Sequence, residues 1–345
     1  MRGSSLVESP PMSNTVEASA PARIDLAGGT LDLWPLHVLH PGSVTVNLAI
    51  DRRASCRVRR RAGGFLVRSA ANGLERRTKR PSELMEDPWT ALVGSLLDSL
   101  GATEPLEIEV SSGVPLGSGL GGSSALTVAL MGALEQFGAR RPSSADPVDF
   151  VRDVETRVLG KPAGVQDYYP PLNGGLHRIW FEPGRTRAER EDADPAEWER
   201  HLTLFDTGAA HSSGMNNWEV FRARLEGDRA VAAALEDVRR AALAMAEATL
   251  SADFPAMGRA LGEEWDARRR LAPVVSTPSI EAAIAAARVA GAWAGKACGA
   301  GGGGCVVFLS PPGKTPAVRE ALASLGYGSV LAVRAENQGL KTQQL

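Results

Sequence analysis

The stretch Val114-Pro-Leu-Gly-Ser-Gly-Leu-Gly-Gly-Ser-Ser-Ala-Leu126 places four glycines between an expected strand and an expected helix. The strand is predicted at residues 106–110, and apolar residues recur at helical spacing from 123 to 137. Glycine permits positive φ angles and lets a ligand approach the backbone closely. The free N–H groups of a helix N-terminus attract anions. The stretch therefore predicts a phosphate-binding loop, and the alternative is a helix capped by serines without any ligand.

Two better-known phosphate-binding patterns do not fit this loop. A P-loop needs a lysine after its glycines, but none follows here, and residues 313–315 fail because the first glycine is missing. A dinucleotide-binding turn matches formally at residues 117–122, but it needs an acidic residue about 20 positions on, at the end of a second strand. Glu135 lies inside the expected helix instead. What remains is a glycine-rich loop whose N–H groups, with the hydroxyls of Ser123 and Ser124, face a triphosphate.

The composition is that of a globular protein with about two domains. The chain has 345 residues, of which 43% are hydrophobic and 23% are charged. Lys and Arg number 38 and Asp and Glu number 40, and the resulting net charge of −2 argues against nucleic acid as a partner. No apolar run approaches the length of about 18 residues that crosses a membrane.

The N-terminus and the cysteines indicate a cytoplasmic protein. Residues 1–17 lack the apolar core of a signal peptide and are expected to form a disordered leader. Cys56, Cys298 and Cys305 are an odd and dispersed set, as expected of reduced thiols. The five histidines never cluster at metal-ligand spacing, so no structural metal is expected.

The remaining patterns predict strands and helices without a strict βαβ repeat. Residues 54–58 alternate with period two, and a glycine turn then leads into residues 65–68, which predicts a hairpin whose arginines form a solvated face. Residues 147–159 have the spacing of an amphipathic helix, and the charged stretch 185–199 is expected to link two halves across the surface. A second glycine cluster at residues 299–304 is expected to meet the first at one site. This interleaving predicts an α+β fold.

Three motifs, in order along the chain, resemble those of the GHMP kinases, which include galactokinase, homoserine kinase and mevalonate kinase. Pro115-Leu-Gly-Ser-Gly-Leu-Gly-Gly-Ser-Ser-Ala125 resembles their ATP-binding loop. Ala22-Arg-Ile-Asp-Leu-Ala-Gly-Gly-Thr-Leu-Asp32 resembles their N-terminal substrate motif, and Lys296-Ala-Cys-Gly-Ala-Gly-Gly-Gly-Gly304 their C-terminal glycine motif. The resemblance implies a two-domain α+β fold with the active site in the interdomain cleft. It places an N-terminal ATP-binding domain at residues 18–190 and a C-terminal domain at residues 191–345.

The resemblance also implies that ATP and Mg²⁺ take part. Ser124 corresponds to the serine that binds Mg²⁺ in the family, and Glu155 corresponds to the second ligand. These roles suit Mg²⁺, which prefers oxygen ligands. Gly122 departs from the family pattern, which usually has serine at this position. The residues implied in ATP binding are Pro115, Gly117, Ser118, Gly119, Leu120, Gly121, Gly122, Ser123 and Ser124.

A catalytic pair is implied as well. Asp167, in Gly164-Val-Gln-Asp167, corresponds to the aspartate that lies beside the attacking hydroxyl in the family. Arg23 corresponds to the basic residue near that aspartate in the galactokinase branch. A carboxylate can orient a hydroxyl or accept its proton, and an arginine keeps the carboxylate ionised and stabilises the transferring charge.

The acceptor motif is most similar to that of the D-glycero-D-manno-heptose 7-phosphate kinase and fucokinase group. Ala27-Gly-Gly-Thr30 followed by Asp32 resembles their Ala-Gly-Gly-Gly-Thr-Asp, whereas the Gly-Glu-His of mevalonate kinase and galactokinase is absent. Trp34-Pro35 departs from the heptose kinase pattern. The residues implied in acceptor binding are Gly28, Gly29, Thr30, Asp32, His211 and Gly301.

The implied function is ATP-dependent phosphorylation of a hydroxyl on a sugar or sugar phosphate, either heptose 7-phosphate-like or fucose-like. Two alternatives stay open: a mevalonate-pathway kinase or related decarboxylase of the same fold, and a non-catalytic sensor that binds ATP and sugar. Asp167, Glu155 and Ser124 are all present, which favours catalysis because binding alone does not need all three. A small molecule is the expected partner, and a homodimer is left open as the assembly.

Overall fold

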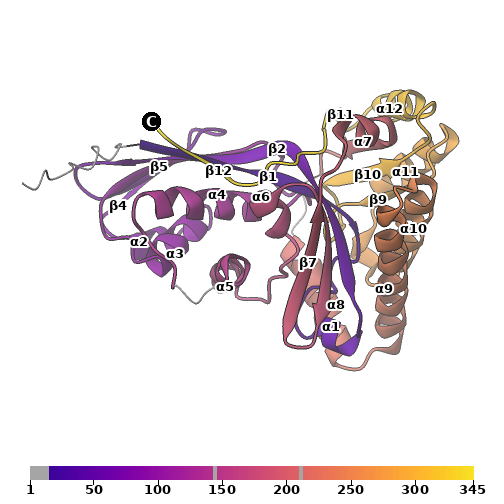
Figure 1. Cartoon of the computed structure of the whole chain (residues 1–345), viewed down its shortest axis with the longest axis horizontal. Helices are drawn as coiled ribbons and strands as arrows, with labels where there is room; N and C mark the ends of the chain where they lie inside the picture. Colours follow the sequence, from indigo (N-terminus) through magenta and orange to yellow (C-terminus); the bar gives the residue numbers. More distant parts are fainter. Residues whose placement is uncertain (1–14, 143–145, 210–212) are drawn as a thin grey trace, which may run out of the picture.

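The N-terminal part of the chain forms an eight-stranded sheet (Figure 1). A computed structural model describes residues 15–142, 146–209 and 213–345. Six strands follow the order β12-β1-β2-β5-β3-β4, and β6 pairs with β2 and β7 beside this path. The strands are β1 (Thr15–Ala27), β2 (Val44–Arg60), β3 (Phe65–Ser69), β4 (Glu75–Thr78), β5 (Leu106–Ser112), β6 (Leu176–Glu182), β7 (Arg185–Glu191) and β12 (Lys341–Gln344).

Helices cover one face of this sheet, as Figure 1 shows for α2 to α6. The long helix α4 (Gly122–Gln136) packs against β1 and β2, with Val128, Leu130 and Leu134 in the core beneath the sheet. This packing fixes the N-terminus of α4, and therefore the glycine-rich loop before it, close to the strands. The other helices of this part are α1 (Leu36–Leu39), α2 (Pro81–Leu84), α3 (Ala91–Ser99), α5 (Pro147–Leu159) and α6 (Tyr169–Asn173).

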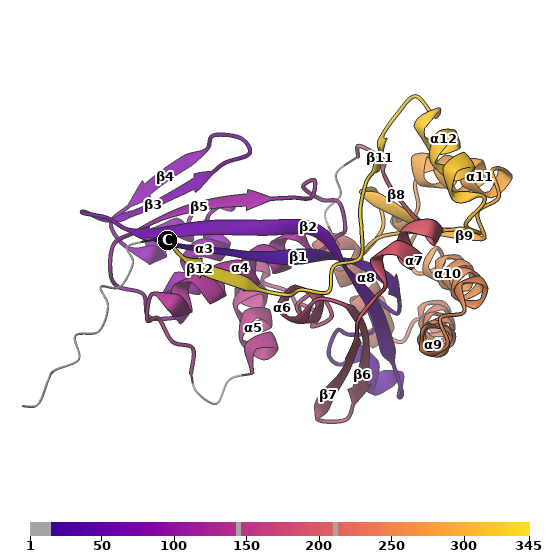
Figure 2. The ribbon, with the colours of Figure 1, turned by 45° about the horizontal axis from the view of Figure 1, so that its top comes forward.

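The C-terminal part is built on a four-stranded sheet with the order β11-β8-β10-β9 (Figure 2). Its strands are β8 (Leu202–Asp206), β9 (Ala294–Ala297), β10 (Cys305–Leu309) and β11 (Ser329–Leu331). Helix α10 packs on β9 and β10, while α9 packs on α10 and reaches β1 and β2 of the larger sheet. The helices are α7 (Pro195–His201), α8 (Ser213–Leu225), α9 (Arg229–Leu250), α10 (Phe254–Arg268), the 3-10 turn η1 (Pro273–Val275), α11 (Pro278–Val289) and α12 (Thr315–Ala323).

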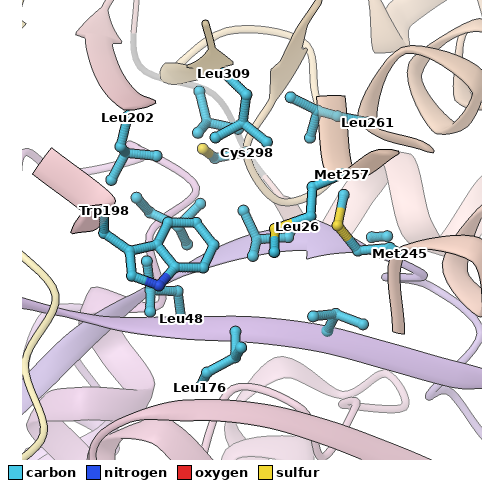
Figure 3. Packing of buried hydrophobic residues seen from close by; sticks show 14 of the residues in the cluster. Leu26, Leu48, Leu176, Trp198, Leu202, Met245, Met257, Leu261, Cys298 and Leu309 are labelled. Carbon is cyan, nitrogen blue, oxygen red and sulfur yellow. The ribbon is translucent and has the colours of Figure 1, made fainter. Parts of the chain in front are cut away.

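A shared hydrophobic core joins the two parts (Figure 3). Leu26 and Leu48 enter it from β1 and β2 of the larger sheet. Met245 and Met257 enter it from α9 and α10, and Cys298 enters it from the chain after β9. Because apolar side chains from both parts are buried in one cluster, the two sheets are held in a fixed relation. The three cysteines of the chain are free thiols.

Two helices agree closely with their prediction from periodicity. Helix α4 begins one residue before the predicted start and ends one residue before the predicted end. Helix α5 spans the predicted residues, from Pro147 to Leu159. Its ends follow ordinary capping rules, since Asp146 accepts a hydrogen bond from the Val148 amide at 2.8 Å and Gly160 ends the helix in the left-handed conformation.

The predicted hairpin of residues 54–58 and 65–68 is wrong. Strand β5 lies between β2 and β3, and β3 pairs with β5 in parallel. Alternation identifies half-buried strands, but it does not choose their partners. The arginines do lie on a solvated face, where Arg57 and Arg59 form ion pairs with Glu17 and Glu107 of the neighbouring strands.

The charged stretch 185–199 is not a surface link, as the sequence had suggested. Its first part is strand β7, which pairs with β6, and its last part forms most of α7, capped by Asp194. Buried Arg178 of β6 forms ion pairs with Glu189 at 3.3 Å and Glu191 at 3.1 Å. The charges therefore pair across the hairpin, which explains how a segment poor in apolar residues forms a strand.

The described chain starts and ends in the same sheet. Strand β1 begins at Thr15, so residues 15–17, which the prediction assigned to a leader, pair with β2, while residues 1–14 lie outside the described part. Strand β12 pairs with β1, with Gln344 opposite Val16. The predicted boundary between the two domains, near residue 190, remains a prediction.

In the part of the chain that the structure describes, no helix combines the length and apolarity needed to cross a membrane.

Candidate active site

The two glycine-rich loops pack against each other, as predicted. The Cys305 amide donates to the Ser118 carbonyl at 2.8 Å. Gly119 has a φ of +75°, and a Cβ at this position would lie 2.3 Å from the Cys298 carbonyl oxygen. Gly119 therefore cannot carry a side chain, because the C-terminal glycine loop lies directly against its backbone. The loop after β9 supports the loop before α4.

The start of α4 differs from a serine-capped helix. The N-cap residue is Gly121, which has a φ of +69° and supplies no side-chain cap. The Ser123 and Ser124 hydroxyls donate instead to the two carboxylate oxygens of Glu155 on α5, at 3.0 and 3.2 Å. The helix therefore begins without a side chain over its first N–H groups, which suits an anionic ligand better than the capped-helix alternative.

Two other predicted residues, Pro115 and Leu120, anchor the glycine-rich loop before α4. Pro115 accepts a hydrogen bond from the Ser118 amide at 3.2 Å, so it closes the turn that enters the loop. The Leu120 side chain is buried in the shared core, while its carbonyl accepts from the Arg23 amide at 3.0 Å. Its backbone therefore joins the loop to β1.

A third side chain, which the sequence analysis missed, holds Glu155. The hydroxyl of Tyr168 donates to Glu155 Oε2, and the Tyr168 ring is buried. Burial, together with the charge of Asp167, raises the pKa of Glu155 above its ordinary value, although the three hydroxyl donors oppose this effect. Glu155 is thus a partly buried carboxylate whose oxygens are oriented by hydroxyl groups.

Arg23 joins the glycine-rich loop to Asp167. Its guanidinium donates to Asp167 Oδ1 from Nε at 2.9 Å, with Nη2 at 2.7 Å from the same oxygen, and Nη1 donates to the Gly119 carbonyl at 2.5 Å. Burial acts to lower the pKa of Arg23, but the Asp167 and Asp25 carboxylates outweigh it and raise that pKa. The Asp167 side chain remains 30% exposed, so a ligand can reach it.

Asp32 is buried, and it lies close enough to Asp167 for the two carboxylates to interact electrostatically. It accepts a hydrogen bond from the Gln166 amide at 3.2 Å, so it orders the chain that carries Asp167. Burial, and then the charge of Asp167, raises the pKa of Asp32 to about 7. The structure thus shows Asp32 bound to the protein backbone, and acceptor binding by this residue remains a prediction.

The raised pKa of Asp32 predicts how stability depends on pH. Between its ordinary value of 3.8 and about 7, the folded state keeps a proton that the unfolded state has lost, so this group favours folding less as the pH rises. Asp32→Asn keeps an oxygen for the Gln166 amide but cannot ionise. We expect the unfolding free energy of this variant, relative to that of the wild type, to rise by about 1–3 kcal/mol from pH 5 to pH 8. Urea unfolding at both pH values measures the gain, and an equal difference at both would contradict the assignment.

Four of the residues predicted to bind the acceptor, Gly28, Gly29, Thr30 and Asp32, lie in the turn after β1. Gly28 has a φ of +88°, and a Cβ there would lie 2.1 Å from the Val44 carbonyl oxygen. The Thr30 hydroxyl donates to the Asn217 side chain of α8 at 3.0 Å. Gly301 lies instead in the C-terminal glycine loop, where a Cβ would lie 2.3 Å from the Val275 carbonyl oxygen, so this glycine packs against the backbone of η1. His211 lies outside the described residues.

A group of four buried charges also escaped sequence reasoning. Asp25, Glu264, Lys296 and Arg268 have side chains that are at most 2% exposed, and they form one ion-pair network beside the acceptor turn. Lys296 belongs to the C-terminal glycine motif, which was a signal that it lies near the site. Arg268 ends an amphipathic helix, where an arginine is ordinarily exposed, and no local pattern marked it.

Two family models match this chain in the order expected of one enzyme. The family model described as GHMP kinases N terminal domain matches residues 89–175. The family model described as GHMP kinases C terminal matches residues 245–328. The chain carries the N- and C-terminal domains of the GHMP kinases. The predictions of an α+β fold with two GHMP domains and of an ATP-dependent phosphotransferase are thereby confirmed.

Relatives of this kinase cover most of its length. The D-glycero-alpha-D-manno-heptose 7-phosphate kinase of Campylobacter jejuni is 25% identical over 315 residues, 87% of this chain and 91% of the relative. A mevalonate kinase of Methanothermobacter thermautotrophicus is 29% identical over 306 residues, 85% of this chain and 90% of the relative. A solved D-glycero-D-manno-heptose 1-phosphate kinase from Bacteroides thetaiotaomicron has a TM-score of 0.76 at 22% identity, covering 96% of this kinase and 99% of that chain.

Proposed function

We propose that this kinase transfers the γ-phosphoryl group of ATP to a hydroxyl of a sugar phosphate, with a heptose phosphate as the first candidate. The observation that carries the proposal is the pairing of Asp167 with Arg23 at 2.7 Å, next to Gly119 of the glycine-rich loop. The similarity to the Campylobacter heptose 7-phosphate kinase supports the substrate class. The predicted cytoplasmic location remains part of the proposal. A homodimer stays open as the assembly, and light scattering measures its mass.

In the proposed reaction, Asp167 and Arg23 act on the acceptor and on the transferring group. The acceptor oxygen forms a bond to the γ-phosphorus while the bond to the β,γ-bridging oxygen breaks, and ADP leaves. Asp167 orients the acceptor hydroxyl and receives its proton. Arg23 fixes the Asp167 carboxylate through their ion pair at 2.7 Å and lies where it can stabilise negative charge on the transferring group.

The oxygens around Glu155 fit Mg²⁺. Ser124 Oγ and a Glu155 carboxylate oxygen lie 3.2 Å apart, and a hydroxyl with a carboxylate is the hard donor set that Mg²⁺ accepts while phosphates and water supply the rest. Among the described residues, no three His, Cys, Asp or Glu side chains gather to hold a metal alone. When bound, Mg²⁺ neutralises charge on the β- and γ-phosphates. In this proposal Ser124 and Glu155 hold the ion, and Tyr168 keeps Glu155 in place.

Glu155→Gln tests the metal assignment. We expect the Mg²⁺ concentration for half-maximal activity to rise about 10–100-fold, because the amide has lost the negative charge that binds the ion. Asp153→Asn is the matched control, since Asp153 lies on the same helix, is 70% exposed and pairs with Arg152 at 2.7 Å. Titration of activity with Mg²⁺ measures both variants, and an unchanged midpoint for Glu155→Gln would refute the assignment.

A panel of acceptors tests the substrate class. ADP release is measured with ATP, Mg²⁺ and, in separate reactions, heptose 7-phosphate, fucose, free hexoses, uronic acids, homoserine and mevalonate. We expect the strongest turnover with heptose 7-phosphate. The second candidate, mevalonate, is favoured by the 29% identity to an archaeal mevalonate kinase. Turnover with mevalonate alone would keep the kinase chemistry and overturn the proposed acceptor.

A further inference from the structure

Thr30, in the turn after β1, adopts a backbone conformation that its side chain disfavours. Its φ is +80°, a value that a β-branched residue rarely adopts and that costs about 1–3 kcal/mol. Such a conformation persists only where neighbouring groups impose it. The contacts of this turn therefore indicate which residue holds it in place.

Arg268, at the end of α10, makes several of those contacts. Its Nη2 donates to the Gly29 carbonyl at 2.8 Å, and its Nη1 donates to the Thr30 hydroxyl at 3.3 Å. The same Nη1 lies 3.5 Å from the Gly299 carbonyl, which it can also reach as a donor. A Cβ built on Gly299 would lie 3.1 Å from Gly119 Cα, so Gly299 is in contact with the loop before α4. One guanidinium thus touches both the acceptor turn and the support of the glycine-rich loop.

The guanidinium of Arg268 is itself fixed by three other buried charges. Glu264 accepts from Arg268 Nη2 at 2.6 Å and from Nε at 2.9 Å. Lys296 Nζ lies 3.2 Å from the same carboxylate and 3.1 Å from Asp25 Oδ1 on β1. Two positive and two negative groups balance the charge, and the network ties β1 to α10 and β9. Buried ion pairs of this kind add little to stability but can specify one geometry.

We propose that Arg268 is a positioning residue that holds the strained turn at Gly29 and Thr30 in register with the glycine-rich loop, so that the acceptor lies in line with the phosphate donor. The inference rests on the proposed function, because it assumes that this turn binds the acceptor. Arg268 acts through the turn and needs no contact with substrate.

Arg268→Lys tests the proposal, because lysine keeps the charge but its single ammonium cannot reach Glu264, Gly29 and Thr30 together. The matched control is Arg178→Lys, since Arg178 is also buried and pairs with two glutamates, but in the β6–β7 hairpin. Hydrogen exchange at the Leu31 and Leu33 amides, which donate to Gly28 and Thr30, should quicken about tenfold or more in Arg268→Lys and stay unchanged in the control.

Kinetics with heptose 7-phosphate form the second arm of the test. We expect Arg268→Lys to lower kcat/KM for this acceptor about tenfold or more while the Kd of ATP changes less than about threefold. In a Thr30→Gly background, where positive φ costs nothing, the same substitution should have a much smaller effect. An equal effect in both backgrounds would overturn the positioning role, as would unchanged exchange.

The two arms separate the two claims. If the wild type does not phosphorylate heptose 7-phosphate, the proposed acceptor fails. The exchange measurement needs no acceptor, so it still decides whether Arg268 holds the turn.

Discussion

Replacing Asp167 by asparagine is expected to reduce kcat by about 10²–10⁴-fold, because the variant loses the group proposed to orient and deprotonate the acceptor. Asparagine has nearly the same shape, and its oxygen can still accept the hydrogen bond that Arg23 donates to Oδ1 at 2.9 Å. The fold and the glycine-rich loop should therefore remain intact. We expect the Kd of ATP to change less than about threefold, so that the loss appears in kcat rather than in nucleotide binding.

Asp98→Asn is the matched control for this variant. Asp98 also pairs with an arginine, Arg157 at 3.0 Å, but it lies on α3 with 44% of its side chain exposed. It should retain wild-type turnover. Single-turnover measurements of phosphoryl transfer distinguish the variants, and full activity of Asp167→Asn would remove Asp167 from the proposed reaction.

Replacing Gly119 by alanine is expected to have the second large effect, on both nucleotide binding and stability. The new Cβ would meet the Cys298 carbonyl oxygen at 2.3 Å, and this atom belongs to the backbone of the opposite loop and cannot turn away. The positive φ of +75° adds a further cost of about 1–2 kcal/mol for a residue with a Cβ. We expect the unfolding free energy to fall by about 3 kcal/mol or more and ATP affinity to fall at least about tenfold.

Gly101→Ala separates the clash from the cost of positive φ. Gly101 has a φ of +64°, and a Cβ there would have no neighbour within 4 Å. This variant should lose about 1–2 kcal/mol and bind ATP normally. Urea unfolding and equilibrium nucleotide binding measure both changes. If the two variants behaved alike, packing between the two glycine loops would not matter for nucleotide binding.

Local patterns predicted the loop and helix that form the centre of the site. Four glycines before a helix with regular apolar spacing are information carried within a dozen residues, and α4 begins at Gly122, one residue before the predicted start. The contact between the two glycine clusters was also predictable, since both need unusual backbone conformations. The roles proposed for Asp167, Arg23 and Glu155 come from resemblance to a family, because a single carboxylate or arginine carries no local signal.

Long-range contacts could not be predicted in the same way. The structure pairs β3 with β5 in parallel, and no pattern within the five residues of β3 identifies that partner. The contacts of Tyr168 and Arg268 each join two different segments of the chain, since Tyr168 donates to Glu155 across 13 positions and Arg268 donates to Gly29 across 239. Sequence periodicity marks a buried position, but it does not show which polar group forms a hydrogen bond or ion pair there.

Direct detection of the product tests the central claim. The kinase is incubated with ATP, Mg²⁺ and D-glycero-D-manno-heptose 7-phosphate, and phosphorus NMR follows the phosphate groups. We predict a second phosphate ester on the heptose, formed in equal amount with ADP and at least about 100-fold more slowly when Asp167→Asn is used. ADP without a new ester, or an ester formed on mevalonate and not on the heptose, would contradict phosphoryl transfer to a sugar phosphate.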